Sequence, residues 1–161
     1  MSKETHPDIR RTLLFFRKDN QILLAMKKRG FGAGKWNGVG GKIEPGETIE
    51  EALVRESVEE VNMKPLSWTK VAELDFVQDA ETDPWHMYVH AFISEEWEGD
   101  PEESDEMKPQ WYDLSAIPYE VMWEDDQYWL PKVLAGETVS GNFTFDESDA
   151  MTFHSIQQTD F

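Results

Sequence analysis

The sequence predicts an α+β fold, an α/β/α sandwich in which helices cover a mixed β-sheet on both faces. Three observations carry this prediction: strand-like apolar segments near the N-terminus, one well-marked helix in the first half, and further strands around a second helical region. The chain has 161 residues, 39% of them hydrophobic, which is enough to bury a core. We therefore expect a single domain over residues 1–161.

The first elements are a hairpin and a flexible-backbone loop. Apolar segments at residues 12–16 and 21–26 are separated by the polar sequence RKDN, which predicts a β-hairpin. Seven glycines then follow between Gly30 and Gly46. This density indicates a loop whose backbone turns tightly or approaches another group closely.

The helix that follows has clear limits. Thr48 and Glu51 form a T-x-x-E capping box at its start, and apolar residues recur behind it at helical spacing. Glu51 and Arg55 are four residues apart in the favourable order for an ion pair. Asn62 tolerates the left-handed conformation that ends many helices.

The second half of the chain contains weaker signals. Alternation of apolar and polar residues predicts strands at 68–76 and 87–93, with an acidic loop between them. A polar loop is expected at 95–106, followed by a short strand at 110–114. Residues 117–134 form a helical region that Pro131 interrupts. Two alternating segments at the C-terminus predict a terminal hairpin.

The charge of the chain is strongly negative and unevenly distributed. The net charge is -18, yet residues 1–42 hold ten Lys or Arg against three Asp or Glu. An acidic surface argues against nucleic-acid duplexes and anionic membranes as partners, because both require a basic face. A small anionic substrate held through metal ions stays compatible with it. The lack of cysteine, of a signal peptide and of a bilayer-spanning apolar run indicates a cytoplasmic protein.

The predicted helix carries an acidic face with two interpretations. Glu56 and Glu60 lie four residues apart, so their carboxylates project from one side, with Glu59 beside them. Such a face is either solvated surface or a site for a hard cation such as Mg²⁺, which binds carboxylates and leaves positions for substrate phosphates. The capping box and the glycine-rich loop leading into the helix favour the cation site.

The spacing of these residues matches a known signature. The Nudix signature G-x5-E-x7-R-E-U-x-E-E-x-G-U, in which U is a bulky aliphatic residue, is matched by Gly41, Glu47, Arg55, Glu56, Glu59 and Glu60. Ser57 stands at a U position, where we expect a small packing deficit, and Asn62 stands where the signature has glycine. The chain therefore resembles the Nudix hydrolases, whose fold is an α/β/α sandwich around a mixed sheet with a loop–helix–loop.

The resemblance extends over about residues 12–145. The segments MKKRGFGAGKWNGVGGK, ESDEMKPQWY and MWEDDQYWLP are similar to those of the animal MutT-homologue branch of the family, which hydrolyses oxidised purine nucleoside triphosphates such as 8-oxo-dGTP. This likeness implies an enzyme that cleaves such nucleotides to monophosphate and pyrophosphate. It also implies a monomer that acts on a small-molecule nucleotide.

The resemblance implies a role for each catalytic residue. Glu56 and Glu60 would bind Mg²⁺, with Mn²⁺ as the alternative, together with the carbonyl of Gly40 or Gly41. Glu59 would be a further ligand or position water. Metal ions of this kind offset phosphate charge and lower the pKa of bound water. The remaining catalytic candidates are the Glu47–Arg55 pair, which would orient the helix, and Glu106, an additional ligand or the base.

Base recognition rests on a second group of residues. Asn37 would hydrogen-bond a purine edge, and Asp125 and Asp126 would contact the base, with one of them protonated so that it donates while its neighbour accepts. Trp123 would stack on the base. The other implied pocket residues are Thr12, Lys27 at the phosphates, Phe31, Phe76 and Met107.

Some alternatives stay open at this level. The substrate is also compatible with an unmodified or methylated purine triphosphate, a dinucleoside polyphosphate or a capped RNA end. A non-catalytic nucleotide sensor with the same fold is a further alternative, although all three acidic residues of the helix are present. The loop before Tyr88 has no match, so that Trp85, His86 and Tyr88 would reshape one wall of the pocket.

Overall fold

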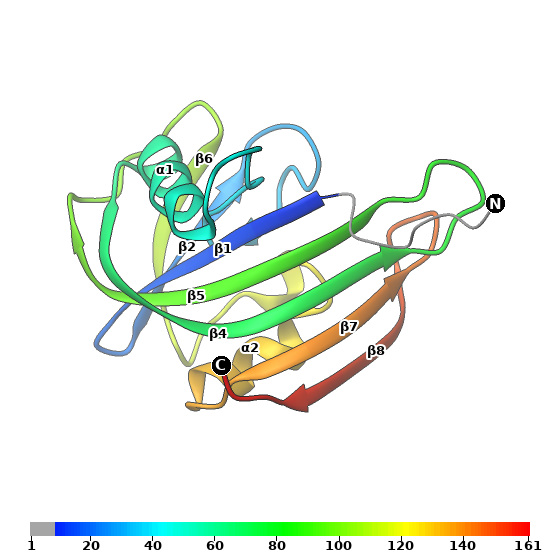
Figure 1. The fold of residues 1–161 in the computed structure, drawn as a ribbon. Helices are drawn as coiled ribbons and strands as arrows, with labels where there is room; N and C mark the ends of the chain where they lie inside the picture. The colour runs from blue at the N-terminus through cyan, green and yellow to red at the C-terminus, as the bar shows by residue number, and fades with distance from the viewer. Residues whose placement is uncertain (1–8) are drawn as a thin grey trace.

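The computed structural model describes residues 9–161, which form one mixed sheet and its covering helices (Figure 1). The strands are β1 (Ile9–Lys18), β2 (Gln21–Lys27), β3 (Trp36–Asn37), β4 (Lys64–Gln78), β5 (His86–Glu98), β6 (Met107–Asp113), β7 (Val139–Phe145) and β8 (Met151–Gln158). The helices are α1 (Ile49–Val61), the 3₁₀ turn η1 (Tyr119–Val121) and α2 (Asp126–Leu134). The strand order is β3-β2-β1-β5-β4-β7-β8, with β6 paired to β2. Strand β1 is parallel to β5 and β4 is parallel to β7, whereas the other pairs are antiparallel.

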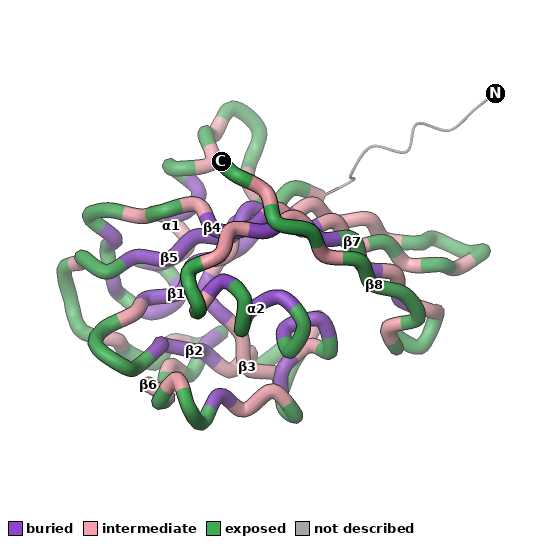
Figure 2. Tube along the Cα trace, turned by 90° about the horizontal axis from the view of Figure 1, so that it is seen from below, coloured by how far each residue is buried: buried purple, intermediate pink, exposed green. Residues whose placement is uncertain are grey.

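Alternation along β1 divides the core into two apolar layers. Leu14 and Phe16 pack with Leu53 of α1, whereas Phe15 packs with Trp129 of α2. Successive strand residues point to opposite faces, so β1 contributes to both layers. Figures 1 and 2 show α1 and α2 on opposite sides of the sheet, with buried residues along the central strands. The predicted α/β/α sandwich around a mixed sheet is confirmed.

Helix α1 begins and ends where the sequence predicts. The Thr48 hydroxyl accepts the Glu51 N–H at 3.0 Å, and the Glu51 carboxylate accepts the Thr48 N–H at 2.9 Å, which completes the capping box. Asn62 has a left-handed φ of 60° and donates its N–H to the Val58 carbonyl. The predicted Glu51–Arg55 ion pair is wrong, because Glu51 turns back to the cap while Arg55 turns toward the preceding loop.

Ser57 is the residue that departs from the Nudix signature inside the helix. Its side chain is fully buried, and its hydroxyl donates to the Leu53 carbonyl at 2.8 Å. The smaller side chain therefore leaves no unpaired polar group beneath α1.

The hairpins are confirmed, but several other elements have different limits. The β1–β2 and β7–β8 pairs are the two predicted hairpins. Strands β4 and β5 exceed the predicted segments, and β5 takes in residues 95–98 of the predicted loop, because backbone pairing continues through polar residues. The region 117–134 splits into η1 and α2 at residues 122–125. The predicted interruption at Pro131 is wrong, because Pro131 lies inside α2 and the helix continues to Leu134.

Backbone contacts join the glycine-rich loop to β1 and so position α1. The Thr12 N–H donates to the Gly41 carbonyl at 2.9 Å, and Leu14 and Val39 exchange two backbone hydrogen bonds. Helix α1 follows this loop directly, which brings its acidic face to the edge of β1. Among residues 9–161, no helix is long and apolar enough to cross a membrane.

Candidate active site

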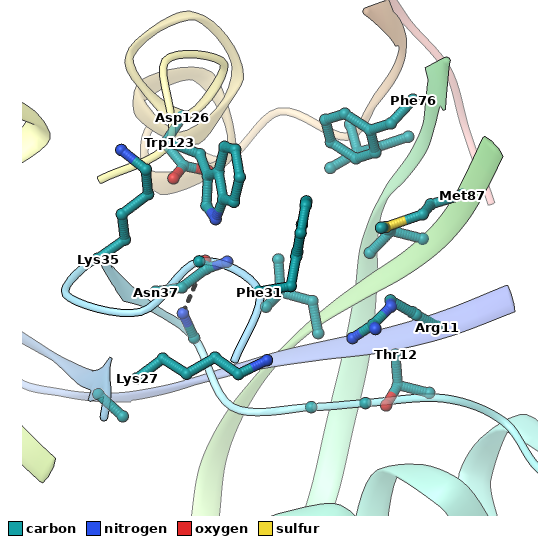
Figure 3. A pocket seen from close by; sticks show the side chains of 18 of the residues that line it. Arg11, Thr12, Lys27, Phe31, Lys35, Asn37, Phe76, Met87, Trp123 and Asp126 are labelled. Carbon is teal, nitrogen blue, oxygen red and sulfur yellow. Dashed lines mark hydrogen bonds between the residues drawn. The ribbon is translucent and has the colours of Figure 1, made fainter. Parts of the chain in front are cut away.

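A cavity of about 260 Å³ brings together most of the predicted site residues (Figure 3). Its walls come from the start of β1, the end of β2, the glycine-rich loop, α1, strands β4 and β5, and the segment that begins α2. One end of the cavity is acidic, and the other end is aromatic. A single cavity therefore spans both chemistries that the sequence predicts.

At the acidic end, two glycines let the backbone approach the glutamates of α1. The Gly40 N–H donates to Glu60 Oε1 at 2.8 Å. A Cβ atom at Gly41 would lie 2.5 Å from Glu56 Cδ, and one at Gly40 would collide with the Thr12 carbonyl. Neither position accepts a side chain without displacing the loop or Glu56.

Burial places two carboxylates of this end in an environment that disfavours their charge. Glu60 is 5% exposed, and burial together with repulsion from Glu56 and Glu106 raises its pKa to about 8, against the opposing Gly40 hydrogen bond. Burial likewise raises the pKa of Glu56, while Arg55 opposes the shift. Hard oxygen donors suit Mg²⁺, whose charge would favour the ionised carboxylates. These residues therefore fit a divalent cation.

Arg55 ties the acidic helix to the loop before it. Its Nε and Nη2 donate to the two carboxylate oxygens of Glu47 at 2.7 and 2.9 Å, and Nη2 also donates to the Lys42 carbonyl at 3.0 Å. Its Nη1 donates to Glu56 at 2.8 Å. Hydrogen bonds from Arg55 lower the pKa of Glu47 to about 2. The pair implied by the resemblance is thus formed, and it holds Glu56 from outside the cavity.

The other two predicted carboxylates lie differently. Glu106 lines the cavity from an exposed position just before β6. The Glu59 side chain is 60% exposed, lies 3.4 Å from Arg55 and is not among the residues that line the cavity. Within residues 9–161, no three acidic or histidine side chains are grouped closely enough to hold a metal ion. Ligand roles for Glu59, Glu106 and the carbonyls of Gly40 and Gly41 stay predictions.

At the aromatic end, Phe31 lies against the predicted stacking residue. The rings of Phe31 and Trp123 are stacked, with centroids 5.1 Å apart and 23° between their planes. Trp85 meets Phe31 edge-on at 6.1 Å and also contacts Phe145 at 5.7 Å, while Phe76 packs beside Phe145 at 6.2 Å. A base that stacks on this face of Trp123 would have to displace the Phe31 ring.

Two adjacent carboxyl groups close this end of the cavity. Asp125 and Asp126, at the start of α2, are 4% and 2% exposed. Burial raises the pKa of Asp125 to about 6, although the indole of Trp129 donates to its Oδ2 at 2.9 Å. Burial and the charge of Asp125 raise the pKa of Asp126 well above its usual range, and Asp126 Oδ2 has no hydrogen-bond partner. Burial therefore favours a protonated carboxyl in this pair, and both residues line the cavity.

Asn37 and Lys35 complete the polar contacts of the aromatic end. The Asn37 carboxamide oxygen accepts the Gly38 N–H at 2.8 Å, the dashed line in Figure 3, so its nitrogen is left to donate. The Lys35 ammonium lies 5.2 Å from the ring centroid of Trp123, a cation–π contact.

The cavity gathers all of the predicted substrate residues and adds others. The predicted residues that line it are Thr12, Lys27, Phe31, Asn37, Phe76, Met107, Trp123, Asp125 and Asp126. Lining residues that the sequence analysis did not select include Arg11, Lys35, Met87, Trp129 and Phe145. Of the three residues expected to reshape a wall, Trp85 lines the cavity, whereas His86 pairs with Asp75 at 2.6 Å.

Comparison with known proteins assigns the chain to a family. The family model described as the NUDIX domain matches residues 6–133. The chain belongs to the Nudix family. Like other Nudix hydrolases, it is an enzyme that acts on phosphorus-containing anhydrides.

Individual relatives of this Nudix hydrolase cover nearly the whole chain. The oxidized purine nucleoside triphosphate hydrolase of Danio rerio is 43% identical over 149 residues, which are 92% of this chain and 94% of that protein. The protein of the same description from Mus musculus is 41% identical with the same coverage. The crystal structure of a MutT protein from Bacillus halodurans matches with a TM-score of 0.82 at 25% identity, over 92% of this chain and 97% of that one.

Proposed function

We propose that this Nudix hydrolase is a Mg²⁺-dependent pyrophosphohydrolase of oxidised purine nucleoside triphosphates, such as 8-oxo-dGTP and 2-hydroxy-dATP. Water would break the bridge between the α- and β-phosphorus and leave the nucleoside monophosphate and pyrophosphate. The observation that carries the proposal is one cavity joining the half-buried Glu56 and the buried Glu60 to the buried Asp125 and Asp126. The two relatives described as oxidized purine nucleoside triphosphate hydrolases support the same substrate class. Such an activity removes damaged precursors before they enter DNA.

The acidic end supplies the groups for the phosphate chain. Glu56 and Glu60 would hold Mg²⁺, or Mn²⁺ as the alternative, and the bound ion would offset phosphate charge and lower the pKa of the attacking water. Arg55 and the Gly40 N–H keep the two carboxylates in place. Lys27, which also lines the cavity, brings a positive charge toward the phosphates.

The aromatic end supplies the groups for the base. A protonated Asp126 can donate to a purine carbonyl, while Asp125 accepts from a ring or exocyclic N–H. The Asn37 amide nitrogen can donate to a further acceptor on the purine. Because burial keeps one proton between two carboxyl groups, the site can match the different donor patterns of oxidised guanine and oxidised adenine.

The proposal also covers the size of the substrate, the cellular compartment and the oligomeric state. The substrate is a small nucleotide, because the chain's net charge of -18 disfavours long nucleic acids. We propose that the enzyme is cytoplasmic, on the composition of the chain, and monomeric, as the family resemblance implies.

The decisive experiment compares kcat/KM for 8-oxo-dGTP and dGTP in the presence of Mg²⁺. We expect a preference of about tenfold or more for the oxidised base, since a site that pairs polar groups with the base rejects a base that leaves them unpaired. Equal values would remove the oxidised-purine assignment and leave nucleotide hydrolysis standing. Glu56→Gln should abolish turnover at an unchanged thermal unfolding midpoint, and persistent turnover would contradict the ligand assignment.

A further inference from the structure

Arg11 projects from β1 into the cavity and lies outside the Nudix signature. Figure 3 shows its guanidinium in the space beside Phe31 and Met87, on the opposite side of β1 from the Thr12 side chain. Its Nε is buried and has no hydrogen-bond partner. Within residues 9–161, Arg11 forms no ion pair with a carboxylate. A buried cationic donor without a partner is costly, so its retention needs a reason.

The position of Arg11 is the junction between the two ends of the cavity. The residue that follows it, Thr12, is bonded through its N–H to the Gly41 carbonyl, beside the acidic end. Glu56 and Glu60 are the carboxylates whose charge acts most on the Arg11 guanidinium, while burial lowers its pKa. Phe31, on its other side, belongs to the aromatic end. A nucleotide that spans the cavity would place its sugar and first phosphate at this junction.

We infer that Arg11 is a substrate-binding residue that donates hydrogen bonds to the phosphate group nearest the sugar of the bound nucleotide. This inference rests on the proposed function. A guanidinium presents several N–H donors in a planar fork that matches phosphate oxygens, and its charge strengthens each hydrogen bond. With cations bound at Glu56 and Glu60, those carboxylates no longer need Arg11 for charge balance. Lys27 reaches into the cavity from β2, so a phosphate here would meet cationic groups from two strands.

The test measures equilibrium binding of two ligands that lack a phosphoanhydride: 8-oxo-dGMP and the nucleoside 8-oxo-deoxyguanosine, both in Mg²⁺ buffer. For Arg11→Met we expect affinity for the monophosphate to fall about tenfold or more, the usual effect of losing a charge-assisted hydrogen bond. Affinity for the nucleoside should stay within about twofold. Arg10→Met is the matched control, because Arg10 is exposed, contacts His90 instead and does not line the cavity. It should leave both affinities unchanged.

A role for Arg11 in charge balance alone predicts a different pattern. Removing its charge would then weaken nucleoside and monophosphate equally, or weaken neither while tightening Mg²⁺ binding, and either result overturns the inference. If Arg11→Met fails to fold, Arg11→Lys decides, since it keeps the charge and loses the fork. We expect a several-fold loss for the monophosphate alone, and an equal effect on both ligands overturns the inference.

An error in the proposed function can be distinguished from an error in the role of Arg11. A wild-type protein that does not cleave 8-oxo-dGTP removes the proposed substrate, and inorganic pyrophosphate, which carries no base, then serves as the probe. Weaker binding of pyrophosphate by Arg11→Met than by the wild type supports a phosphate-binding role. Equal binding of pyrophosphate by the two proteins overturns it.

Discussion

The indole nitrogen of Trp129 donates a hydrogen bond of 2.9 Å to Oδ2 of Asp125, one turn earlier in the chain. Asp126, the next residue, has a buried Oδ2 with no partner. The donated hydrogen bond favours the ionised form of Asp125, whereas burial and the charge of Asp125 disfavour the ionised form of Asp126. These effects favour protonation of Asp126 over protonation of Asp125.

Asp126→Asn should stabilise the protein at high pH. The pKa of Asp126 is raised in the folded state, so the folded protein binds more protons than the unfolded chain above the ordinary Asp pKa, and wild-type stability falls as pH rises. Asparagine keeps a donor in the same place and does not ionise. Urea unfolding at pH 5 and pH 8 should show a gain for the variant that is larger at pH 8. A gain that is the same at both pH values would contradict a raised pKa.

Mg²⁺ binding should release a proton at neutral pH. Without metal, burial and neighbouring carboxylates raise the pKa of Glu60 to about 8, so the carboxyl is mostly protonated at pH 7 and must lose its proton to bind the ion. Titration calorimetry in two buffers of different ionisation enthalpy should detect release of up to about one proton at pH 7 and almost none at pH 9.5. Glu60→Gln should abolish the release. The exposed Glu50→Gln should retain it, and loss in both variants would place the proton elsewhere.

Glu47→Gln should weaken Mg²⁺ binding although Glu47 is outside the cavity. Its carboxylate fixes two nitrogens of Arg55, and the third nitrogen holds Glu56. Residues that orient metal ligands in this way typically change metal affinity or activity by about 10- to 100-fold. Mg²⁺ titration of the activity measures the effect. Glu44→Gln is the control, because Glu44 lies 3.8 Å from Arg55 and is largely exposed, and an equal loss there would remove the special role of Glu47.

The acid unfolding of the same variant tests the pair independently. The pKa of Glu47 is depressed to about 2, so its contribution to stability is fully present above the ordinary Glu pKa and is lost as pH falls through 2. Glu47→Gln should therefore unfold with a shallower pH dependence between about pH 4.5 and pH 2 than the wild type. Circular dichroism over this range records it, and identical slopes would mean that Arg55 does not stabilise the ionised Glu47.

Local signals in the sequence account for the acidic end of the site. Thr48, Glu51 and Asn62 determine the limits of α1, and the resulting helical spacing determines which glutamates share a face. Local signals did not identify Arg11 as a cavity residue. Its place in the cavity depends on the pairing of β1, which is parallel with β5 and antiparallel with the glycine-rich loop. Such nonlocal pairing leaves no periodic trace in the residues around Arg11.

The resemblance could carry over residues only where the segments match. It placed Asn37, Trp123, Asp125 and Asp126 in one cavity, yet it gave no hint that Phe31 would already cover a face of Trp123. It was also silent on the unmatched loop that leads to β5, because side-chain positions there depend on packing against the end of β7.

Trp85→Ala should reduce the selectivity of the enzyme for the oxidised base. Trp85 is half-buried, lines the cavity, meets Phe31 edge-on at 6.1 Å and packs against Phe145 in a tilted arrangement at 5.7 Å. Its removal frees the Phe31 ring and opens one wall, so the base is held less firmly against the polar groups that read it. We expect KM for 8-oxo-dGTP to rise about tenfold with kcat little changed, since the lost contacts are made in both ground and transition states.

Two control variants separate a role in base selection from a role in folding. Trp85→Phe should restore most of the selectivity, because a phenyl ring can also pack edge-on against Phe31. Trp97→Ala removes an indole that packs on Phe16 and Trp111, outside the cavity, and should lower stability while the ratio of kcat/KM for 8-oxo-dGTP over dGTP stays the same. If Trp85→Ala behaves like Trp97→Ala, the loop contributes to folding and not to the choice of base.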